Sequence, residues 1–301
     1  MILTFGTHSP LSSRRILAGL LGAPIAHSAS PAMHERAAEA LGLRCHYQLI
    51  EIAGAGREDL KVLLEGVRRL GFAGINVTFP YKEAVIDLLD ELSPAAAQIG
   101  AVNTIVVRDN RLIGHNTDTT GFARTVSDLV TASSRSAVAV IGAGGVGKAI
   151  AFALAGLGVS ELRIFDAEPA KASRLAAQIE RAGNTKLRIK VADAVEDALS
   201  GVAGLINASP VGMLPSRGTP VPEELLHAGL WVADAVYSPL WTPLLTAAKA
   251  KGAATITGRD LAIYQAADAF ELFTGLTPST AEMGIAFDEL MAKRYSATHA
   301  A

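Results

Sequence analysis

Residues 136–147, SAVAVIGAGGVG, decide the fold class of this 301-residue chain. An apolar strand is followed at once by glycines with the spacing G-x-G-x-x-G, at Gly142, Gly144 and Gly147. The first glycine permits a tight turn, the second lets backbone amides approach a pyrophosphate, and the third lets helix and strand pack closely. In this strand-turn-helix context the stretch predicts a dinucleotide site, and a glycine-rich turn without a ligand is the alternative.

Asp166 lies 19 residues beyond the last of these glycines, at the end of the next predicted strand. A carboxylate at that place can accept hydrogen bonds from a ribose 2′-hydroxyl. Together with Glu168 it would repel a 2′-phosphate, so NAD is the favoured cofactor. Lys171 and Arg174 on the following helix could still offer cations to that phosphate, which keeps NADP open. Asp166 could also cap the helix that begins at Pro169, and the two roles are compatible.

Composition and charge narrow the class of protein. The chain has 27 Lys and Arg against 29 Asp and Glu, a net charge of −2. Such a balance supplies no strong field for phosphate backbones or anionic lipid, so we expect a small-molecule partner, no nucleic acid and no membrane. Cys45 is the single cysteine, which excludes an internal disulfide and a multi-cysteine metal site, and no metal is expected.

The N-terminal stretch leaves one alternative open. Ser12-Ser13-Arg14-Arg15, followed by an apolar run, resembles a twin-Arg export signal. Against export, Pro24 interrupts the run, which continues directly into polar candidate site residues. We therefore expect residues 16–21 to form a buried first strand of a cytoplasmic protein. No apolar run approaches the roughly 20 residues that cross a bilayer.

Periodicity predicts two successive α/β units. In the first 115 residues, apolar runs typical of strands alternate with helical segments. Around residues 60–70, leucines and a valine recur at helical spacing between two such runs. Asp109-Asn110 is expected to form a two-residue hairpin loop, which adds an antiparallel pair near the sheet edge. From Ser136 onward a doubly wound order is expected. The predicted strands are 16–21, 47–52, 74–77, 104–107, 111–113, 136–142, 161–165, 187–191, 204–207 and 231–236, with helices around 60–70, up to 157 and from 169.

Reactive side chains concentrate in three segments that this interpretation places in loops at strand ends. These segments are residues 22–34, residues 74–82, and Asn103 together with residues 116–118. Loops beyond the carboxyl ends of strands are where open α/β sheets bind ligands. Hydroxyls and amides spread over several loops suit a small polyhydroxylated substrate, because each substrate hydroxyl needs its own partner.

These residues resemble the shikimate and quinate dehydrogenase family. The resemblance covers nearly the whole chain in one order. It rests on GAPIAHSASPAMH (22–34), GINVTFPYK (74–82), GAVNT (100–104), HNTDTTG (115–121), NASPVGM (207–213), DAVYSPLWTPL (234–244) and GRDLAIYQAA (258–267). It implies NAD(P)-dependent interconversion of shikimate and 3-dehydroshikimate, or of quinate and 3-dehydroquinate. A related enzyme for another cyclic acid, such as an amino analogue, and a non-catalytic dinucleotide-binding regulator are the alternatives.

The resemblance also implies an α/β fold with an N-terminal substrate domain, a doubly wound Rossmann domain, and C-terminal helices that return to the substrate domain. The expected bounds are 1–117, completed by 260–301, and 118–259. A homodimer is left open. Lys82 and Asp118 become the catalytic pair. Substrate-binding roles fall to Ser28, Ser30, Asn76, Thr78, Asn103, Tyr237 and Gln265, and cofactor-binding roles to Gly142, Gly144, Gly145, Val146, Gly147, Asp166, Lys171, Ser209, Ala235 and Gly258.

The chemistry of a secondary alcohol explains why Lys82 and Asp118 would be needed. Its proton must be removed as hydride leaves, so a base or a relay is needed at that oxygen. A free lysine, with a pKa of about 10.4, is a poor base at neutral pH. Burial would lower that pKa and a nearby carboxylate would raise it, so the proton acceptor stays open, as does stabilisation of an alkoxide by the ammonium. The alternative is a surface Lys82 on a helix that starts at Pro80, with Asp118 as a helix cap.

Three departures from the usual family pattern bear on specificity. Asp166-Ala167-Glu168 stands where many NADP-using members carry Asn-Arg-Thr, which favours NAD. Ser209 replaces the usual threonine. Asp260-Leu261 replaces Gly-Met, and a carboxylate at this place is expected to disturb a site that binds an anionic acid.

Overall fold

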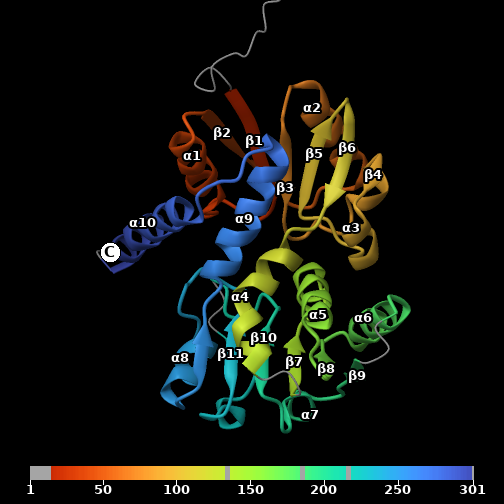
Figure 1. The fold of residues 1–301 in the computed structure, drawn as a ribbon, viewed down its shortest axis with the longest axis vertical. Coiled ribbons are helices and arrows are strands. Elements are labelled where there is room, and N and C mark those ends of the chain that lie inside the picture. The colour runs from red at the N-terminus through yellow and green to blue at the C-terminus, as the bar shows by residue number, and fades with distance from the viewer. Residues whose placement is uncertain (1–14, 133–135, 184–186, 215–217, 300–301) are drawn as a thin grey trace, which may run out of the picture.

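The computed structural model describes residues 15–132, 136–183, 187–214 and 218–299, which fold around two separate six-stranded sheets (Figure 1). The first sheet has the order β2-β1-β3-β5-β6-β4. Its strands are β1 (Arg15–Gly22), β2 (Arg44–Glu51), β3 (Gly74–Val77), β4 (Glu91–Leu92), β5 (Thr104–Arg108) and β6 (Arg111–His115). Its helices are α1 (Ser30–Ala40), α2 (Arg57–Arg69), α3 (Pro94–Ile99), α9 (Arg259–Thr274) and α10 (Thr280–His299).

The second sheet is entirely parallel in its strand pairs and has the order β12-β11-β10-β7-β8-β9, which is the doubly wound arrangement. Its strands are β7 (Ala137–Ile141), β8 (Glu161–Phe165), β9 (Arg188–Val191), β10 (Gly204–Asn207), β11 (Trp231–Asp234) and β12 (Ala254–Ile256). Its helices are α4 (Asp118–Ala132), α5 (Gly145–Leu157), α6 (Pro169–Arg181), α7 (Val195–Leu199) and α8 (Pro243–Ala250). The expected α/β fold class is confirmed, and the exact domain bounds stay a prediction.

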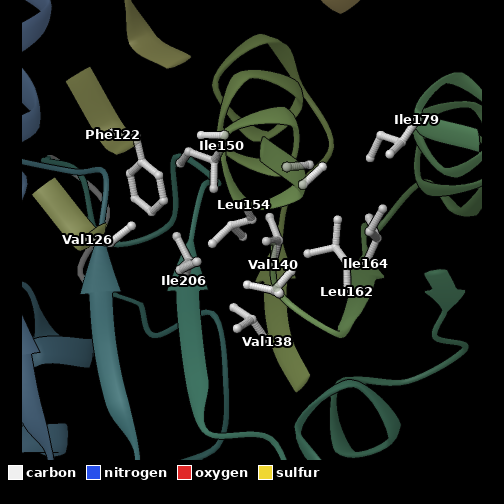
Figure 2. Close-up of a cluster of buried hydrophobic side chains, with 14 of the residues drawn as sticks. Phe122, Val126, Val138, Val140, Ile150, Leu154, Leu162, Ile164, Ile179 and Ile206 are labelled. Atoms are coloured by element: carbon white, nitrogen blue, oxygen red, sulfur yellow. The ribbon is translucent and has the colours of Figure 1, made fainter. Parts of the chain in front are cut away.

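Each sheet has a hydrophobic core on both faces. Strand β1 turns Ile16 and Leu20 toward α1, α9 and α10, whereas Leu21 points to the opposite face, which α2 covers. In the second sheet, Phe122 of α4 and Leu154 of α5 pack over β7, β8 and β10 (Figure 2). Burial on two faces explains why central strands such as β1 and β7 are near-continuous apolar runs. Among the described helices, none is long and apolar enough to cross a membrane.

Helices α4 and α9 lie side by side and connect the two sheets (Figure 1). Gly121 of α4 allows this close approach, because a Cβ atom there would lie 2.8 Å from the backbone nitrogen of Gln265. Leu261 of α9 belongs to the core of the second sheet, whereas Phe270 further along belongs to the first. The pair thus fixes the start of α4 against both halves of the molecule.

Several local predictions can be compared with the structure. Asp109 and Asn110 have φ angles of 50° and 60° and connect β5 to β6, so the two-residue hairpin is confirmed. The alternative helix from Pro80 is wrong, because residues 80–85 form turns before a short 3₁₀ helix, Ile86–Leu88. Residues 22–34 are not all loop, since α1 begins at Ser30. Residues 12–14 of the export-like motif lie outside the described residues.

The packing of α9 on β3 yields a stability prediction. A Cβ at Gly74 would lie 2.3 Å from the Ile105 carbonyl oxygen and 2.5 Å from the Phe273 ring. Gly74→Ala should therefore lower the free energy of unfolding by about 1–3 kcal/mol, as overpacking does. Gly66→Ala in α2 is the matched control, since nothing lies within 4 Å of its added methyl group, and it should stabilise by about 0.5–1 kcal/mol. Urea unfolding of both variants measures the difference, and equal effects would contradict the packing argument.

Candidate active site

Lys82 and Asp118 form an ion pair where the turn after β3 meets the first residue of α4. Lys82 Nζ lies 2.6 Å from Asp118 Oδ2, and the two side chains are 12% and 9% exposed. Water screens such a pair weakly, so the charges interact strongly. Lys82 is therefore not the exposed surface lysine of the alternative interpretation.

Asn103 holds the carboxylate of this pair in place. Its Nδ2 donates to Asp118 Oδ1 at 2.9 Å and to Thr117 Oγ1 at 2.9 Å, while its Oδ1 accepts from the Thr117 backbone nitrogen at 2.7 Å. The turn that carries Lys82 is fixed by a backbone bond, since Val102 N donates to the Lys82 carbonyl at 2.8 Å. Both members of the pair thus depend on residues 102–103.

Asn76, in β3, belongs to the same hydrogen-bond network as Asn103. Its Nδ2 donates to the Asn103 carbonyl at 3.2 Å and to Thr104 Oγ1 at 2.9 Å, and its Oδ1 accepts from the Tyr47 hydroxyl at 2.7 Å. The side chain is buried with these bonds formed. Asn76 therefore braces the neighbouring site residues, whatever contact it makes with a substrate.

Ser28 and Ser30 present two adjacent hydroxyls at the start of α1. Ser28 Oγ donates to Ser30 Oγ at 3.1 Å and accepts from the Ser30 backbone nitrogen at 3.2 Å. The N-terminus of a helix favours an anion, because backbone N–H groups and the helix dipole point toward it. The two hydroxyls and the helix end together suit the recognition of a carboxylate.

Three further candidates lie at the edges of this group. Thr78 is partly exposed and its methyl group occupies the space beside Gly22. Tyr237 is half-buried with its ring 5.8 Å from that of Phe287. Gln265 is half-buried and donates to the Ala262 carbonyl of its own helix at 2.9 Å. The structure records no hydrogen bond from these three side chains to the Lys82–Asp118 pair.

The glycine-rich turn has the geometry that a dinucleotide requires. Gly142 has a φ of 106°, and a Cβ there would lie 2.8 Å from the Ser209 backbone nitrogen. A Cβ at Gly147 would lie 2.0 Å from the Gly142 carbonyl oxygen, whereas nothing lies within 4 Å of one at Gly144. Gly144 is the N-cap of α5 and has open space on its Cβ side, so the residues present fit a pyrophosphate at this helix end. Val146, in the first turn of α5, is partly exposed.

Asp166 is bonded to this turn through both carboxylate oxygens. Oδ2 accepts from the Ala143 backbone nitrogen at 2.7 Å, and Oδ1 accepts from the Glu168 backbone nitrogen at 2.8 Å. Lys171 pairs with Glu168 at 2.6 Å, and this bond raises the pKa of Lys171. Arg174 is exposed. The charge of Lys171 is thus already matched by a carboxylate.

The two halves of the site adjoin at Gly145. A Cβ there would lie 3.2 Å from both Cβ and Cδ of Lys82. Lys148 of α5 also forms an ion pair with Glu83, Nζ to Oε2 at 2.8 Å. The dinucleotide turn and the Lys82–Asp118 pair therefore belong to one site.

Asp234 organises the loops that follow β10 and β11. It is 3% exposed and accepts from Val236 N at 2.9 Å, Asn207 Nδ2 at 3.0 Å and Thr242 Oγ1 at 2.7 Å. Asn207 Oδ1 in turn accepts from Ser209 N at 3.0 Å and from Ser209 Oγ at 2.7 Å. Burial raises the pKa of Asp234 to about 6 despite these bonds.

The remaining cofactor candidates lie beside these loops. A Cβ at Gly258 would lie 2.7 Å from the Val236 carbonyl oxygen and 2.9 Å from that of Ala235. Asp260 pairs with Arg259 at 2.8 Å, and Arg259 also binds Asp288 at 2.7 Å. The extra carboxylate at Asp260 is therefore matched by a neighbouring guanidinium, which weakens the expectation that it disturbs an anionic substrate. Among the described residues no cluster of metal-ligating side chains is found.

Sequence reasoning assigned no role to several residues that complete this site. Tyr47 appeared only as part of a strand, and its hydroxyl bond crosses from β2 to β3. Thr104, Thr117 and Asp234 lay within quoted motifs, which was the available signal, yet their partners become visible only in three dimensions.

A doubly wound sheet with a dinucleotide-type turn beside a buried Lys–Asp pair defines a dinucleotide-dependent oxidoreductase. Residues 20–105 match the family model of the shikimate dehydrogenase substrate binding domain, and residues 119–210 match the ThiF family. The chain is 45% identical to an NADP⁺ shikimate dehydrogenase of Streptomyces avermitilis, with 89% of this chain and 93% of the relative covered. It is 44% identical to an NAD⁺ quinate/shikimate dehydrogenase of Corynebacterium efficiens, with 90% and 97% covered.

A solved structure agrees with these relatives. The quinate dehydrogenase of Corynebacterium glutamicum in complex with NAD superposes with a TM-score of 0.83 at 41% identity, covering 92% of this chain and 99% of the other. The chain belongs to the shikimate/quinate dehydrogenase family of NAD- or NADP-dependent oxidoreductases.

Asp234 yields a prediction on pH and stability. Its folded pKa of about 6 lies above the unfolded value near 3.8, so between these values the folded state binds more protons. The stabilisation from Asp234 is complete below pH 3.8 and is lost as pH rises through 6, up to about 3 kcal/mol. The difference in unfolding free energy between wild type and Asp234→Asn should fall from pH 4 to 6.5 in urea titrations. Exposed Asp193→Asn is the control, and a flat difference for Asp234→Asn would contradict the assignment.

Proposed function

We propose that this protein interconverts shikimate and 3-dehydroshikimate, or quinate and 3-dehydroquinate, with Lys82 and Asp118 as its catalytic pair. The observation that carries the proposal is the 2.6 Å contact between Lys82 and Asp118, fixed by Asn103 and adjoining Gly145 of the dinucleotide turn. Proton transfer at an alcohol oxygen next to a hydride acceptor requires such an arrangement. The relatives support a cyclic polyhydroxylated acid as the substrate class.

The Lys82–Asp118 pair acts on the reacting oxygen as a unit. A bound nicotinamide ring would accept hydride from the alcohol carbon in the oxidative direction. Lys82 holds the alcohol oxygen, Asp118 fixes Lys82, and the alcohol proton passes to this coupled pair. In the reductive direction, the Lys82 ammonium returns a proton to the carbonyl oxygen. Asn103 keeps the carboxylate in place by its 2.9 Å bond.

Substrate recognition is proposed to follow the layout of the polar groups. Ser28 and Ser30 bind the carboxylate at the N-terminus of α1, because their hydroxyls and the helix end favour an anion. Substrate hydroxyls are assigned to Thr78, Asn103 and Gln265, with Asn76 as a brace and Tyr237 near the nicotinamide end. A buried polar group left without a partner costs about 1–3 kcal/mol, which gives each contact discriminating power.

The cofactor is proposed to be NAD in preference to NADP. Asp166 is held at the turn by Ala143 and faces the place where a ribose 2′-hydroxyl would bind. Glu168 adds a second carboxylate, and its ion pair with Lys171 neutralises a charge that could attract a 2′-phosphate. The proposed contacts with the cofactor involve Gly142, Gly144, Gly145, Val146, Gly147, Asp166, Ser209, Ala235 and Gly258, with Lys171 nearby. The cytoplasmic location inferred from the sequence stays a prediction.

The Lys82–Asp118 site also bears on the two alternatives, a non-catalytic regulator and an enzyme for an amino analogue. A regulator without turnover would have no need of a buried Lys–Asp pair, since a 2.6 Å ion pair at 12% and 9% exposure is costly to desolvate. An enzyme for an amino analogue would keep the pair, so steady-state assays on shikimate, quinate and their amino analogues distinguish it.

The catalytic assignment predicts a loss confined to turnover. Lys82→Ala and Asp118→Asn should each lower kcat on the order of 100-fold to 10,000-fold, because they remove proton transfer in the transition state. Dissociation constants for NAD, measured by fluorescence titration, should stay within about twofold. Lys61→Ala on the exposed face of α2 is the control and should keep wild-type kcat. A variant at position 82 or 118 that changed only KM would refute the role of that residue.

Cofactor preference is tested with the wild-type protein and two variants. The value of kcat/KM should be roughly 10- to 100-fold higher with NAD than with NADP, because two carboxylates repel a 2′-phosphate, and the ratio should shrink as salt rises. Asp166→Asn and Glu168→Gln should each narrow the ratio, while the KM for shikimate stays unchanged. A wild-type preference for NADP would show instead that Lys171 or Arg174 reaches the phosphate.

A further inference from the structure

Tyr47 lies in the first sheet beside proposed substrate-binding residues, and none of the proposed roles explains its presence there. It lies in β2, is 3% exposed, and its hydroxyl donates to Asn76 Oδ1 at 2.7 Å. A tyrosine hydroxyl in an apolar core is costly unless bonded, so the position selects a residue that reaches Asn76. Phenylalanine would fill the same volume without that bond.

The Tyr47 hydroxyl is also influenced by Ser30. Burial raises the pKa of Tyr47, and a hydrogen bond with the Ser30 side chain acts in the opposite direction. Ser30 is in turn bonded to Ser28. Tyr47 therefore touches the group proposed to bind the carboxylate and, through Asn76, the group that holds Asp118.

His34 fixes the plane of the Tyr47 ring. The two rings are stacked with centroids 4.6 Å apart, and both ring nitrogens of His34 lack a hydrogen-bond partner among the described residues. Burial lowers the pKa of His34 to about 3, so the ring is neutral at physiological pH. The Phe270 and Phe273 rings of α9 lie with their centroids 6.0 and 5.9 Å from that of His34. The stacked His34 ring offers Tyr47 no hydrogen bond, so the Tyr47 hydroxyl finds its partner in Asn76.

We propose that Tyr47 is a positioning residue that keeps the Ser28–Ser30 hydroxyls in register with the Lys82–Asp118 pair. This inference rests on the proposed function. A cyclic acid carries its carboxylate and its reacting alcohol at fixed places on one ring, so both ends must be met at once. Small misplacements of reacting groups cost large factors in rate. Ser28 is bonded to Ser30, whose side chain acts on the Tyr47 hydroxyl, and hydrogen bonds continue from Tyr47 through Asn76 and Asn103 to Asp118.

The test compares two tyrosine-to-phenylalanine variants. Tyr47→Phe should lower kcat/KM for shikimate about 10-fold or more, through both kcat and KM, with the KM for NAD unchanged. Tyr81→Phe is the matched control, because its buried hydroxyl donates to the Ile52 carbonyl at 2.8 Å in the same half of the molecule. It should lower the melting temperature comparably and leave the KM for shikimate within twofold. Equal kinetic losses in both variants would overturn the proposal.

A second readout separates positioning from a general structural effect. The ratio of kcat/KM for shikimate to that for its methyl ester reports how well the carboxylate is held. This ratio should fall in Tyr47→Phe toward that of Ser30→Ala, and the double variant should lose less than the sum of the two effects. An unchanged ratio or strict additivity would contradict coupling between Tyr47 and Ser30.

A third readout does not need turnover, so it distinguishes failure of this inference from failure of the proposed function. In a crystal structure of Tyr47→Phe, the Asn76 side chain should leave its position against Thr104. An Asn76 side chain that keeps its place would overturn the role of Tyr47. A wild-type protein inactive on both shikimate and quinate would overturn the proposed substrate alone.

Discussion

The buried side-chain amide of Asn103 is the group on which the rest of the site depends. It lies just before β5 and bonds to Thr117, which precedes α4, and to Asp118, the first residue of that helix. An unmet amide at 3% exposure would cost about 1–3 kcal/mol, so strand and helix start are held together. Because α4 continues into the core of the second sheet through Phe122, this bond network also ties the Lys82–Asp118 pair to the second sheet.

Contact between Lys82 and Gly145 explains a glycine that the cofactor motif alone does not require. The spacing G-x-G-x-x-G leaves position 145 free, yet a side chain there would press on the Lys82 stem at 3.2 Å. The ion pair between Lys148 and Glu83 brings the same two segments together one helical turn further on. Helix α5 and the turn that carries Lys82 thus constrain each other's sequence.

Much of the fold could be predicted from the sequence because its signals are local. Apolar runs, the glycine spacing and the Asp109-Asn110 hairpin depend on neighbouring residues, and the structure confirms them. The two-residue strand β4 was not predicted, because tertiary pairing determines it. Residues 22–34 were expected to be loop although α1 begins at Ser30, with Pro31 in its first turn as the local signal. Candidate site residues came from motifs, but the bonds among Tyr47, Asn76 and Asn103 cross three strands and leave no spacing signal.

In the proposed preference for NAD, Glu168 would disfavour a 2′-phosphate in two ways. Its carboxylate would repel a 2′-phosphate directly, and its 2.6 Å bond to Lys171 engages a cation that could attract one. Asp166 adds a group whose direction is already fixed by Ala143 before any ligand binds. A preorganised acceptor loses little conformational freedom on binding a ribose hydroxyl. The proposed preference for NAD would therefore arise from the arrangement of three side chains and two backbone amides, and not from a single charge.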